Sequence, residues 1–378
     1  MNKISTALGT MSGTSMDGVD ISIIQSDGES KYKVIKDKYF EYPQAIYKHL
    51  TKLRDKIKNS KDLKKFSKEI KNVEKEITLF HAKAVNQILK KTKANVDFIG
   101  FHGQTIYHNA KERISNQLGD GKLLAKITKK KVVYNFRQND LKNGGEGAPL
   151  TPIFHQMLQK KFNIKPVSFN KSYSFAVLSF INIGGILNST AIWSDGALTA
   201  RDLGPGMCLI DKWIRTKTNK KYDKNGDIAK FGKVNKKVLN KYYSFQESVP
   251  ERFSYDTSDF DISFAKKLSL KDGAATLALY TANQIISHFK SSEKLPEFSK
   301  QKIILCGGGR KNKFLVRIIK SWNSNVKLID DYGIDGDFVE SQAFAYLAIR
   351  SHLKLPISFP ETTGCKKPST GGEIIKAK

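Results

Sequence analysis

The sequence predicts an α/β protein built from two lobes of related structure. Its 378 residues exceed what one hydrophobic core usually organises. A strand, a glycine-bearing turn and a second strand are expected in residues 4–24 and again in 176–193, and such a recurrence indicates a duplicated unit. We expect the first lobe to contain residues 1–133 with about 353–378, and the second lobe to contain residues 134–352.

The first turn lies in the segment Gly9–Asp20, which reads GTMSGTSMDGVD. Gly13 and Gly18 allow backbone amides to point into the turn, where they can hold a phosphate. Hydroxyl and carboxylate side chains accompany these glycines: Ser12, Thr14, Ser15, Asp17 and Asp20. Asp17 or Asp20 can orient Mg²⁺ through its bound water. An ordinary polar turn without a ligand is the alternative.

The second hairpin carries Gly184 and Gly185 at its turn. Two such turns, one from each lobe, can hold the phosphates of one nucleotide. A third glycine-rich junction follows the apolar run 301–306, where consecutive glycines let an adenine or ribose lie against bare backbone. The residues of this junction are Gly307, Gly308, Gly309 and Asn312. A glycine turn that binds nothing is the alternative.

Two apolar runs end in polar side chains that suit a substrate. The run 96–101 is of the buried-strand type, and ligands of α/β sheets collect beyond the carboxyl ends of strands. The side chains that follow this run are His102, Gln104 and Thr105. Arg137, after the strand-like run 131–134, offers a forked donor to a carboxylate or phosphate. The glycine-dense loop 140–149 indicates either a mobile cover over the substrate or a boundary between lobes.

Two acidic residues are candidates for chemistry. Asp202 ends a strand-like segment before the turn Gly204–Gly206. A carboxylate held rigidly at that place suits a general base, and a turn-forming or helix-capping role is the alternative. Glu340, one turn into a predicted helix, can reach a ribose hydroxyl or a metal-bound water. The aromatic and acidic segment 250–264 indicates no role by itself.

The composition limits which binding partners and which cellular compartment we expect. Lysine and arginine number 65 against 36 acidic residues, a net charge of +29. This excess would attract nucleic acid, and a basic nucleic-acid-binding protein is the function that the charge alone would suggest. The lysines are spread over many segments, however, so we favour a solvated basic surface without a nucleic-acid partner. The three cysteines lie far apart and favour neither a disulfide framework nor a zinc site. No run approaches ~18 apolar residues, so we expect a soluble cytoplasmic protein without a membrane partner.

Seven segments resemble the anhydro-N-acetylmuramic acid kinases, of the sugar kinase, chaperone ATPase and actin superfamily: GTMSGTSMDGVD, GFHGQTIYH, NGGEGAPLTPIFH, INIGGILNST, DLGPG, LCGGGRKN and ESQAFAYLA. The resemblance implies two RNase H-like lobes around a central cleft. It implies that ATP and water open the 1,6-anhydro ring while O6 is phosphorylated, which gives N-acetylmuramic acid 6-phosphate in peptidoglycan recycling. The implied ligands are ATP, Mg²⁺ and a small anhydrosugar. The resemblance is also compatible with a homodimer.

The resemblance also assigns residues. The ATP phosphate segment falls on Gly13, Thr14, Ser15, Met16, Asp17, Gly18, Val19 and Asp20, and the catalytic aspartate falls on Asp202. A carboxylate can take the proton of the water that attacks the anomeric carbon, and the released bridge oxygen can attack the γ-phosphate. The chain departs from the family pattern at Asn135, Leu203, Met207 and 254–260. A nucleotide-binding member of the superfamily without turnover is therefore the alternative function.

Overall fold

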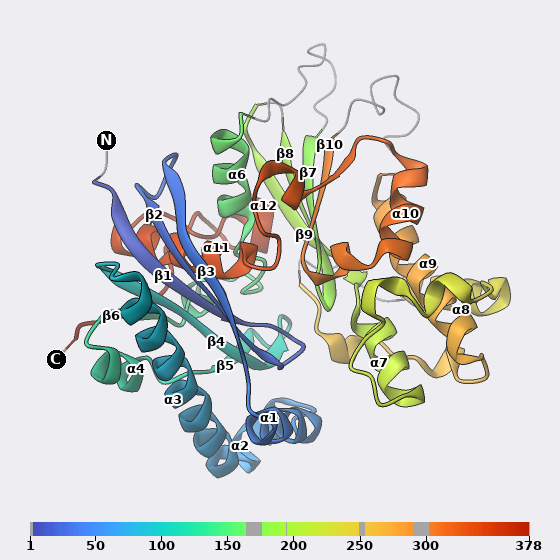
Figure 1. The fold of residues 1–378 in the computed structure, drawn as a ribbon, viewed down its shortest axis with the longest axis horizontal. Helices are drawn as coiled ribbons and strands as arrows, with labels where there is room; N and C mark the ends of the chain where they lie inside the picture. Colours follow the sequence, from blue (N-terminus) through green and yellow to red (C-terminus); the bar gives the residue numbers. More distant parts are fainter. Residues whose placement is uncertain (1–2, 164–175, 194, 249–253, 290–301, 378) are drawn as a thin grey trace. The chain divides into compact units, whose positions relative to one another are not determined.

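The computed structural model describes residues 3–163, 176–193, 195–248, 254–289 and 302–377 (Figure 1). The chain forms two compact units. Unit 1 consists of Met1–Ile164 and Phe338–Lys378, and unit 2 of Lys165–Asp337. Unit 1 is longer at both joints than the first lobe expected from the sequence, which ended at 133 and resumed near 353. The chain passes into unit 2 after residue 164 and returns to unit 1 after residue 337.

Unit 1 is built on a seven-stranded sheet in the described residues, in the order β12-β6-β4-β1-β2-β3 with β5 paired to β4. The first three strands form an antiparallel meander, and β4 and then β6 continue the sheet parallel to β1. The strands are β1 (Ser5–Ser12), β2 (Gly18–Ser26), β3 (Tyr32–Glu41), β4 (Phe98–Asn109), β5 (Ile114–Leu118), β6 (Lys131–Tyr134) and β12 (Glu373–Ile375).

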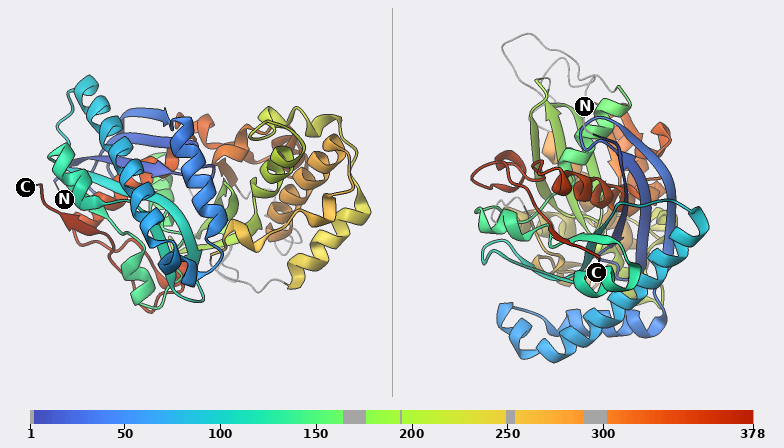
Figure 2. Two further views of the ribbon diagram at one scale, coloured as in Figure 1. Left: turned by 90° about the horizontal axis from the view of Figure 1, so that it is seen from below. Right: turned by 90° about the vertical axis from the view of Figure 1, so that its left-hand side faces the viewer.

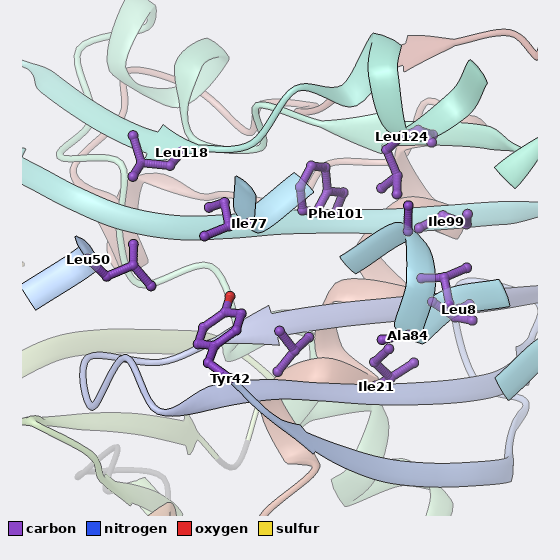
Figure 3. Close-up of a cluster of buried hydrophobic side chains, with 14 of the residues drawn as sticks. Leu8, Ile21, Tyr42, Leu50, Ile77, Ala84, Ile99, Phe101, Leu118 and Leu124 are labelled. Atoms are coloured by element: carbon purple, nitrogen blue, oxygen red, sulfur yellow. The ribbon is translucent and has the colours of Figure 1, made fainter. Parts of the chain in front are cut away.

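The helices of unit 1 cover this sheet. They are α1 (Gln44–Lys56), α2 (Ser60–Lys65), α3 (Ser67–Thr92), α4 (Gly121–Thr128), α5 (Gln138–Lys142), α6 (Pro152–Lys161), α11 (Val339–His352) and α12 (Pro360–Thr363). The apolar spacing of α3 buries Ile77 and Ala84 against strand residues such as Leu8 and Ile99 (Figure 3). Burial of a large aliphatic side chain contributes about 1.5–3 kcal/mol, so this cluster fixes α3 on the sheet.

Helix α11 packs against the side of β1 that does not face α3 (Figures 1 and 2). Successive strand side chains point to opposite faces, so Gly9 faces away from the cluster that contains Leu8. A Cβ at Gly9 would lie 2.0 Å from the carbonyl oxygen of Ser341, and one at Gly100 would lie 2.2 Å from that of Phe344. The helix backbone therefore rests directly on the strands, which explains why α11 belongs to unit 1.

Unit 2 repeats the strand order of unit 1. Its five-stranded sheet runs β11-β10-β7-β8-β9, with β7, β8 and β9 antiparallel and with β10 and β11 parallel to β7. The strands are β7 (Ala176–Ile183), β8 (Ile186–Trp193), β9 (Leu198–Pro205), β10 (Lys302–Cys306) and β11 (Val326–Leu328). In both units a meander is extended by parallel strands beside its first strand, so the predicted α/β class with two RNase H-like lobes is confirmed.

The longer helices of unit 2 are α7 (Cys208–Lys217), α8 (Lys236–Ser248), α9 (Leu270–Phe289) and α10 (Lys313–Trp322). Ile285 of α9 and Leu315 of α10 pack on β7 and β10 through Ile181 and Leu305. A second cluster, around the fully buried Trp213, joins α7, α8 and α9. Among the described helices, none is both long enough and apolar enough to cross a membrane.

The first prediction concerns the contact between β1 and α11. Replacing Gly9 with Ala should lower the free energy of unfolding by about 1–3 kcal/mol, because the added methyl overlaps backbone that cannot move locally. Urea unfolding measures this loss. The matched control is Gly13→Ala, whose Cβ would meet nothing nearer than Ser15 Oγ at 4.0 Å. Equal stability of the two variants would contradict this packing of α11 on β1.

The second prediction concerns buried histidines. His81 and His155 are at most 1 % exposed, and burial lowers the pKa of each from 6.5 to about 3. Between these values the unfolded chain binds more protons than the folded one, so stability should fall as pH drops from about 6.5 towards 3. Each histidine contributes a slope of about 1.4 kcal/mol per pH unit. Urea unfolding at pH 7.5 and 5 should show this, with a shallower slope in His81→Asn.

Candidate functional site

The turn between β1 and β2 presents hydroxyl groups to solvent. Thr14 and Ser15 are exposed, whereas Met16 is 2 % exposed and anchors the turn in the core. Met16 has a positive φ of 57° and donates its N–H to the carbonyl of Gly13 (3.1 Å). Ser15 Oγ donates to Asp17 Oδ1 at 2.5 Å. The tip at 13–17 is therefore a tight, outward-facing turn with hydroxyl and carboxylate groups.

The next predicted residues of this segment are part of β2. Gly18 leaves room for β3, because a Cβ there would lie 2.5 Å from the ring of Tyr39. Val19 is fully buried in the core. Asp20 pairs with Met11 and Tyr39 in the ladders on both sides. These three residues shape the hairpin.

A chain of buried hydrogen bonds supports this tip. Gln104, 1 % exposed, donates its Nε2 to the Gly13 carbonyl at 3.1 Å, and its Oε1 lies 2.6 Å from Ser12 Oγ. Tyr42 donates its hydroxyl to Ser12 Oγ (3.2 Å) and lies 3.1 Å from His81 Nε2. The amide predicted to contact substrate is thus engaged in holding the turn. Tyr42 and His81 had no sequence signal for this role, because only the fold brings them together.

His102 and Arg137, predicted as substrate residues, lie together. Arg137 Nη2 is 3.1 Å from His102 Nε2, and since a guanidinium only donates, Nε2 accepts. The ring proton is therefore on Nδ1, which donates to the Gly103 carbonyl at 2.9 Å. Burial and the Arg137 charge lower the pKa of His102 to about 3. His102 is thus a neutral imidazole, suited to orient Arg137 and unsuited to exchange protons near neutral pH.

The glycine-dense loop 140–149 is organised by a buried carboxylate. Asp140, 1 % exposed, accepts the N–H of Gly147 at 2.7 Å and the hydroxyl of Thr363 at 2.6 Å. A Cβ at Gly145 would lie 2.3 Å from Asp140 Oδ2. Arg137 Nη1 donates to the Gly147 carbonyl at 2.9 Å. The loop therefore holds Arg137 in place, and Gly145 allows the loop to pack closely on Asp140.

The remaining predicted residues of unit 1 are Thr105 and Glu340. Thr105 Oγ1 accepts from Gln117 of β5 at 3.2 Å. Glu340 lies in the first turn of α11. Gly9 packs against Ser341, near the start of α11. Gly28, which lies beside the start of β1, packs against Ile349, further along the helix. The N-terminus of α11 therefore lies towards the end of β1 that carries the tip. A helix N-terminus favours anions.

In unit 2 the turn between β7 and β8 is joined to the start of α7. The carbonyl of Gly184 accepts the N–H of Met207 at 2.8 Å, and that of Gly185 accepts the N–H of Gly206 at 3.0 Å. A Cβ at Gly206 would lie 2.3 Å from the Gly184 oxygen. The backbone of Met207 makes this contact, so the departure from the family pattern at that position leaves the turn intact.

The glycine run after β10 lies beside the end of β7. A Cβ at Gly307, which has a φ of +77°, would lie 2.3 Å from Asn182 Oδ1, and one at Gly309 would lie 2.2 Å from Ile183 Cγ2. These two glycines are therefore required by packing. Gly308 differs, because no described atom lies within 4 Å of a Cβ built there. Its backbone is open to a ligand.

Asn312 caps the N-terminus of α10, and its side-chain NH2 group is left over as a donor. Its Oδ1 accepts the N–H of Leu315 at 3.0 Å as the helix N-cap. The side chain is buried, at 3 % exposure, and its Nδ2 has no hydrogen-bond partner among the described residues. A buried unsatisfied N–H group costs about 1–3 kcal/mol. This amide is therefore a candidate donor to a bound ligand.

Asp202 lies at the same end of the sheet as these glycines. It pairs with Asn188, two positions past the Ile186 that follows the β7–β8 turn. The side chain is 9 % exposed, and its Oδ2 accepts the N–H of Tyr255 at 2.7 Å. The predicted residues of unit 2 thus converge at one sheet edge: Gly184, Gly185, Asp202, Gly307, Gly308, Gly309 and Asn312.

The segment 254–260, for which the sequence indicated no role, contacts this aspartate. Tyr255 and Phe260 are buried, and their rings meet edge to face at 5.6 Å. The N–H of Asp256 donates to Asp259 Oδ2 at 2.9 Å. The segment is therefore a structured loop that presents the Tyr255 N–H to Asp202.

The departure at Asn135 has a local explanation. Asn135 has a positive φ of 55°, a conformation that asparagine tolerates better than most residues. Its Nδ2 donates to Glu373 Oε1 at 3.2 Å. The residue turns the chain after β6 and thereby leads it to Arg137.

No group of three or more His, Cys, Asp or Glu side chains in the described part of the chain could hold a metal directly. The three cysteines are free thiols.

Nearly the whole chain matches a family of known proteins. Residues 5–377 match the family model described as anhydro-N-acetylmuramic acid kinase. The curated anhydro-N-acetylmuramic acid kinase of Pelagibacter ubique (strain HTCC1062) is 51% identical over 383 residues, with 100% of both chains covered. The enzyme of that name from Agrobacterium fabrum (strain C58 / ATCC 33970) is 39% identical over 387 residues, again with 100% of both covered. Because both comparisons span the length of the chain, this protein belongs to the anhydro-N-acetylmuramic acid kinase family.

Proposed function

We propose that this protein uses ATP and water to open 1,6-anhydro-N-acetylmuramic acid and to phosphorylate its O6, which yields N-acetylmuramic acid 6-phosphate for peptidoglycan recycling. Family membership supports a sugar kinase. The observation that carries the finer proposal is Asp202, a carboxylate fixed by the Tyr255 N–H at the sheet edge that holds the glycine turns. We assign the protein to the cytoplasm, where free thiols persist.

Asp202 supplies the base that the reaction needs. Its carboxylate takes a proton from the water whose oxygen bonds to the anomeric carbon. The bond between that carbon and the bridging O6 breaks, and O6 then forms the bond to the γ-phosphorus as the bond to ADP breaks. The proton remains on Asp202 until it is released to solvent. Arg137, oriented by neutral His102, binds a carboxylate or phosphate of the substrates through its fork.

The nucleotide contacts come from backbone and small side chains. In unit 1 the tip 13–17 supplies amides and the hydroxyls of Thr14 and Ser15 to phosphate oxygens. In unit 2 the open backbone at Gly308 and the unsatisfied Nδ2 of Asn312 fit the adenosine part. Mg²⁺ would be held by phosphate oxygens and by water, with Asp17 and Glu340 orienting that water, and it would neutralise phosphate charge.

The alternative is a family member that binds nucleotide without turnover, suggested by Asn135 and Leu203. Incubation with Mg-ATP and the anhydrosugar in heavy-oxygen water separates the two functions. Mass analysis of the product should show label at C1 together with phosphate on O6. ATP binding without any phosphorylated sugar would instead support the alternative.

The third prediction concerns Asp202. Asp202→Asn should lower kcat by about 10²–10⁴-fold, because the amide cannot accept the water proton. Steady-state assays of phosphate transfer measure this, with melting temperature as the test of folding. Asp195→Asn is the matched control, since Asp195 is exposed in the β8–β9 turn and bonds locally to the Ala197 N–H. Unchanged turnover in Asp202→Asn would remove this residue from the mechanism.

The fourth prediction concerns Gly308. Gly308→Ala should leave the melting temperature unchanged, because the added methyl meets no described atom. If adenosine lies against this backbone, the same methyl should weaken ATP binding about tenfold, which corresponds to 1.4 kcal/mol. Calorimetric titration with Mg-ATP measures the affinity. Wild-type affinity in a stable variant would place the nucleotide elsewhere.

A further inference from the structure

Arg310 follows the glycine run and is buried, with a side chain only 3 % exposed. Each of the three nitrogens of its guanidinium donates at least one hydrogen bond. Nε and Nη2 bind Asp330 side-on, at 2.7 and 2.9 Å. Nη2 also reaches Asp335 at 3.4 Å, and Nη1 donates to Asp337 at 2.6 Å and to the Gly307 carbonyl at 3.2 Å.

The carboxylates around Arg310 come from one short segment, 330–337. Asp330 lies in the turn η8 (Ile329–Tyr332). Gly336 allows the close approach, because a Cβ there would lie 2.2 Å from Arg310 Nε. Asp337 is the last residue of unit 2, and the chain continues directly into α11. One side chain therefore connects the glycine run to the segment that leads into α11.

Of these contacts, the hydrogen bond from Arg310 Nη1 to the Gly307 carbonyl is the one that can affect ligand binding. Gly307 has a φ of +77°, and its carbonyl shares Nη1 with Asp337. The orientation of this peptide determines how the next residue, Gly308, presents its open backbone. The hydrogen bond from Arg310 lowers the pKa of Asp330, so the pair is ionised near neutral pH. A bidentate ion pair of this kind is geometrically specific.

We propose that Arg310 is a positioning residue for nucleotide: through its fork on Asp330 and Asp337 it fixes the Gly307 carbonyl and so the backbone against which adenosine binds. The inference rests on the proposed function, in which Gly307–Gly309 contact ATP. The ligand class is a purine nucleoside triphosphate, and the contribution of Arg310 is geometric. A lysine carries the same charge but lacks the planar fork.

Arg310→Lys tests this directly. We expect the Kd and KM for Mg-ATP to rise about tenfold, as for the loss of one charge-assisted hydrogen bond, while kcat at saturating ATP stays within about twofold. The control is Arg317→Lys, the same substitution on a side chain of α10 that lies over the Phe314 ring and outside the buried fork. It should keep wild-type Kd and KM.

A second variant controls for misfolding. Asp330→Asn keeps Arg310 and its bonds to Asp337, and the Asp330 side chain is 41 % exposed, so this variant should fold and show a smaller rise in the ATP Kd. Near-ultraviolet circular dichroism and melting temperature report on folding. A lowered melting temperature with unchanged ATP affinity in both variants would make Arg310 purely structural and overturn the inference.

The wild-type titration separates the two proposals. If the wild-type protein binds Mg-ATP and Arg310→Lys binds it equally well, the inference about Arg310 is wrong and the proposed function stands. If the wild-type protein binds no Mg-ATP, the proposed function fails and the inference fails with it. If Arg310→Lys and Arg317→Lys weaken binding equally, the effect is not specific to the buried fork, which also contradicts the inference.

Discussion

In each unit the first strand of an antiparallel hairpin pairs in parallel with a strand that comes much later in the chain. In unit 1 this pairing places Gln104 beside Ser12, and in unit 2 it places Cys306 beside Asn182. Parallel strands end at the same sheet edge, so the residues that follow both strands are brought together. Without this pairing neither the supported tip at 13–17 nor the glycine run beside the β7–β8 turn would exist.

Much of the polarity at these edges serves the protein itself. Gln104 and Ser12 hold the tip, neutral His102 orients Arg137, and Asp140 organises the loop that receives Arg137. Buried polar groups need partners, since an unsatisfied one costs about 1–3 kcal/mol. Among the described residues, groups at these edges that are not used in this way include the exposed hydroxyls on the tip, the open backbone at Gly308 and the Nδ2 of Asn312.

The glycines divide in the same way. Gly9, Gly100, Gly307 and Gly309 are required by close packing, because a methyl group at any of them would overlap neighbouring atoms. Gly308 has no such neighbour in the described residues. A motif of three glycines therefore combines two packing requirements with one exposed position, and the sequence alone presents all three as equivalent.

The duplicated α/β architecture could be predicted from the residues alone, because hairpins and apolar runs are encoded by local periodicity. Short motifs in a fixed order also indicated the family and the candidate residues at the strand ends. What those residues touch depends on how the chain folds. That Tyr255 meets Asp202, that His81 and Tyr42 support the first turn, and that Arg310 binds the segment entering α11 are contacts between distant parts of the chain. Such contacts arise from the packing of whole elements, so no local pattern of residues could specify them.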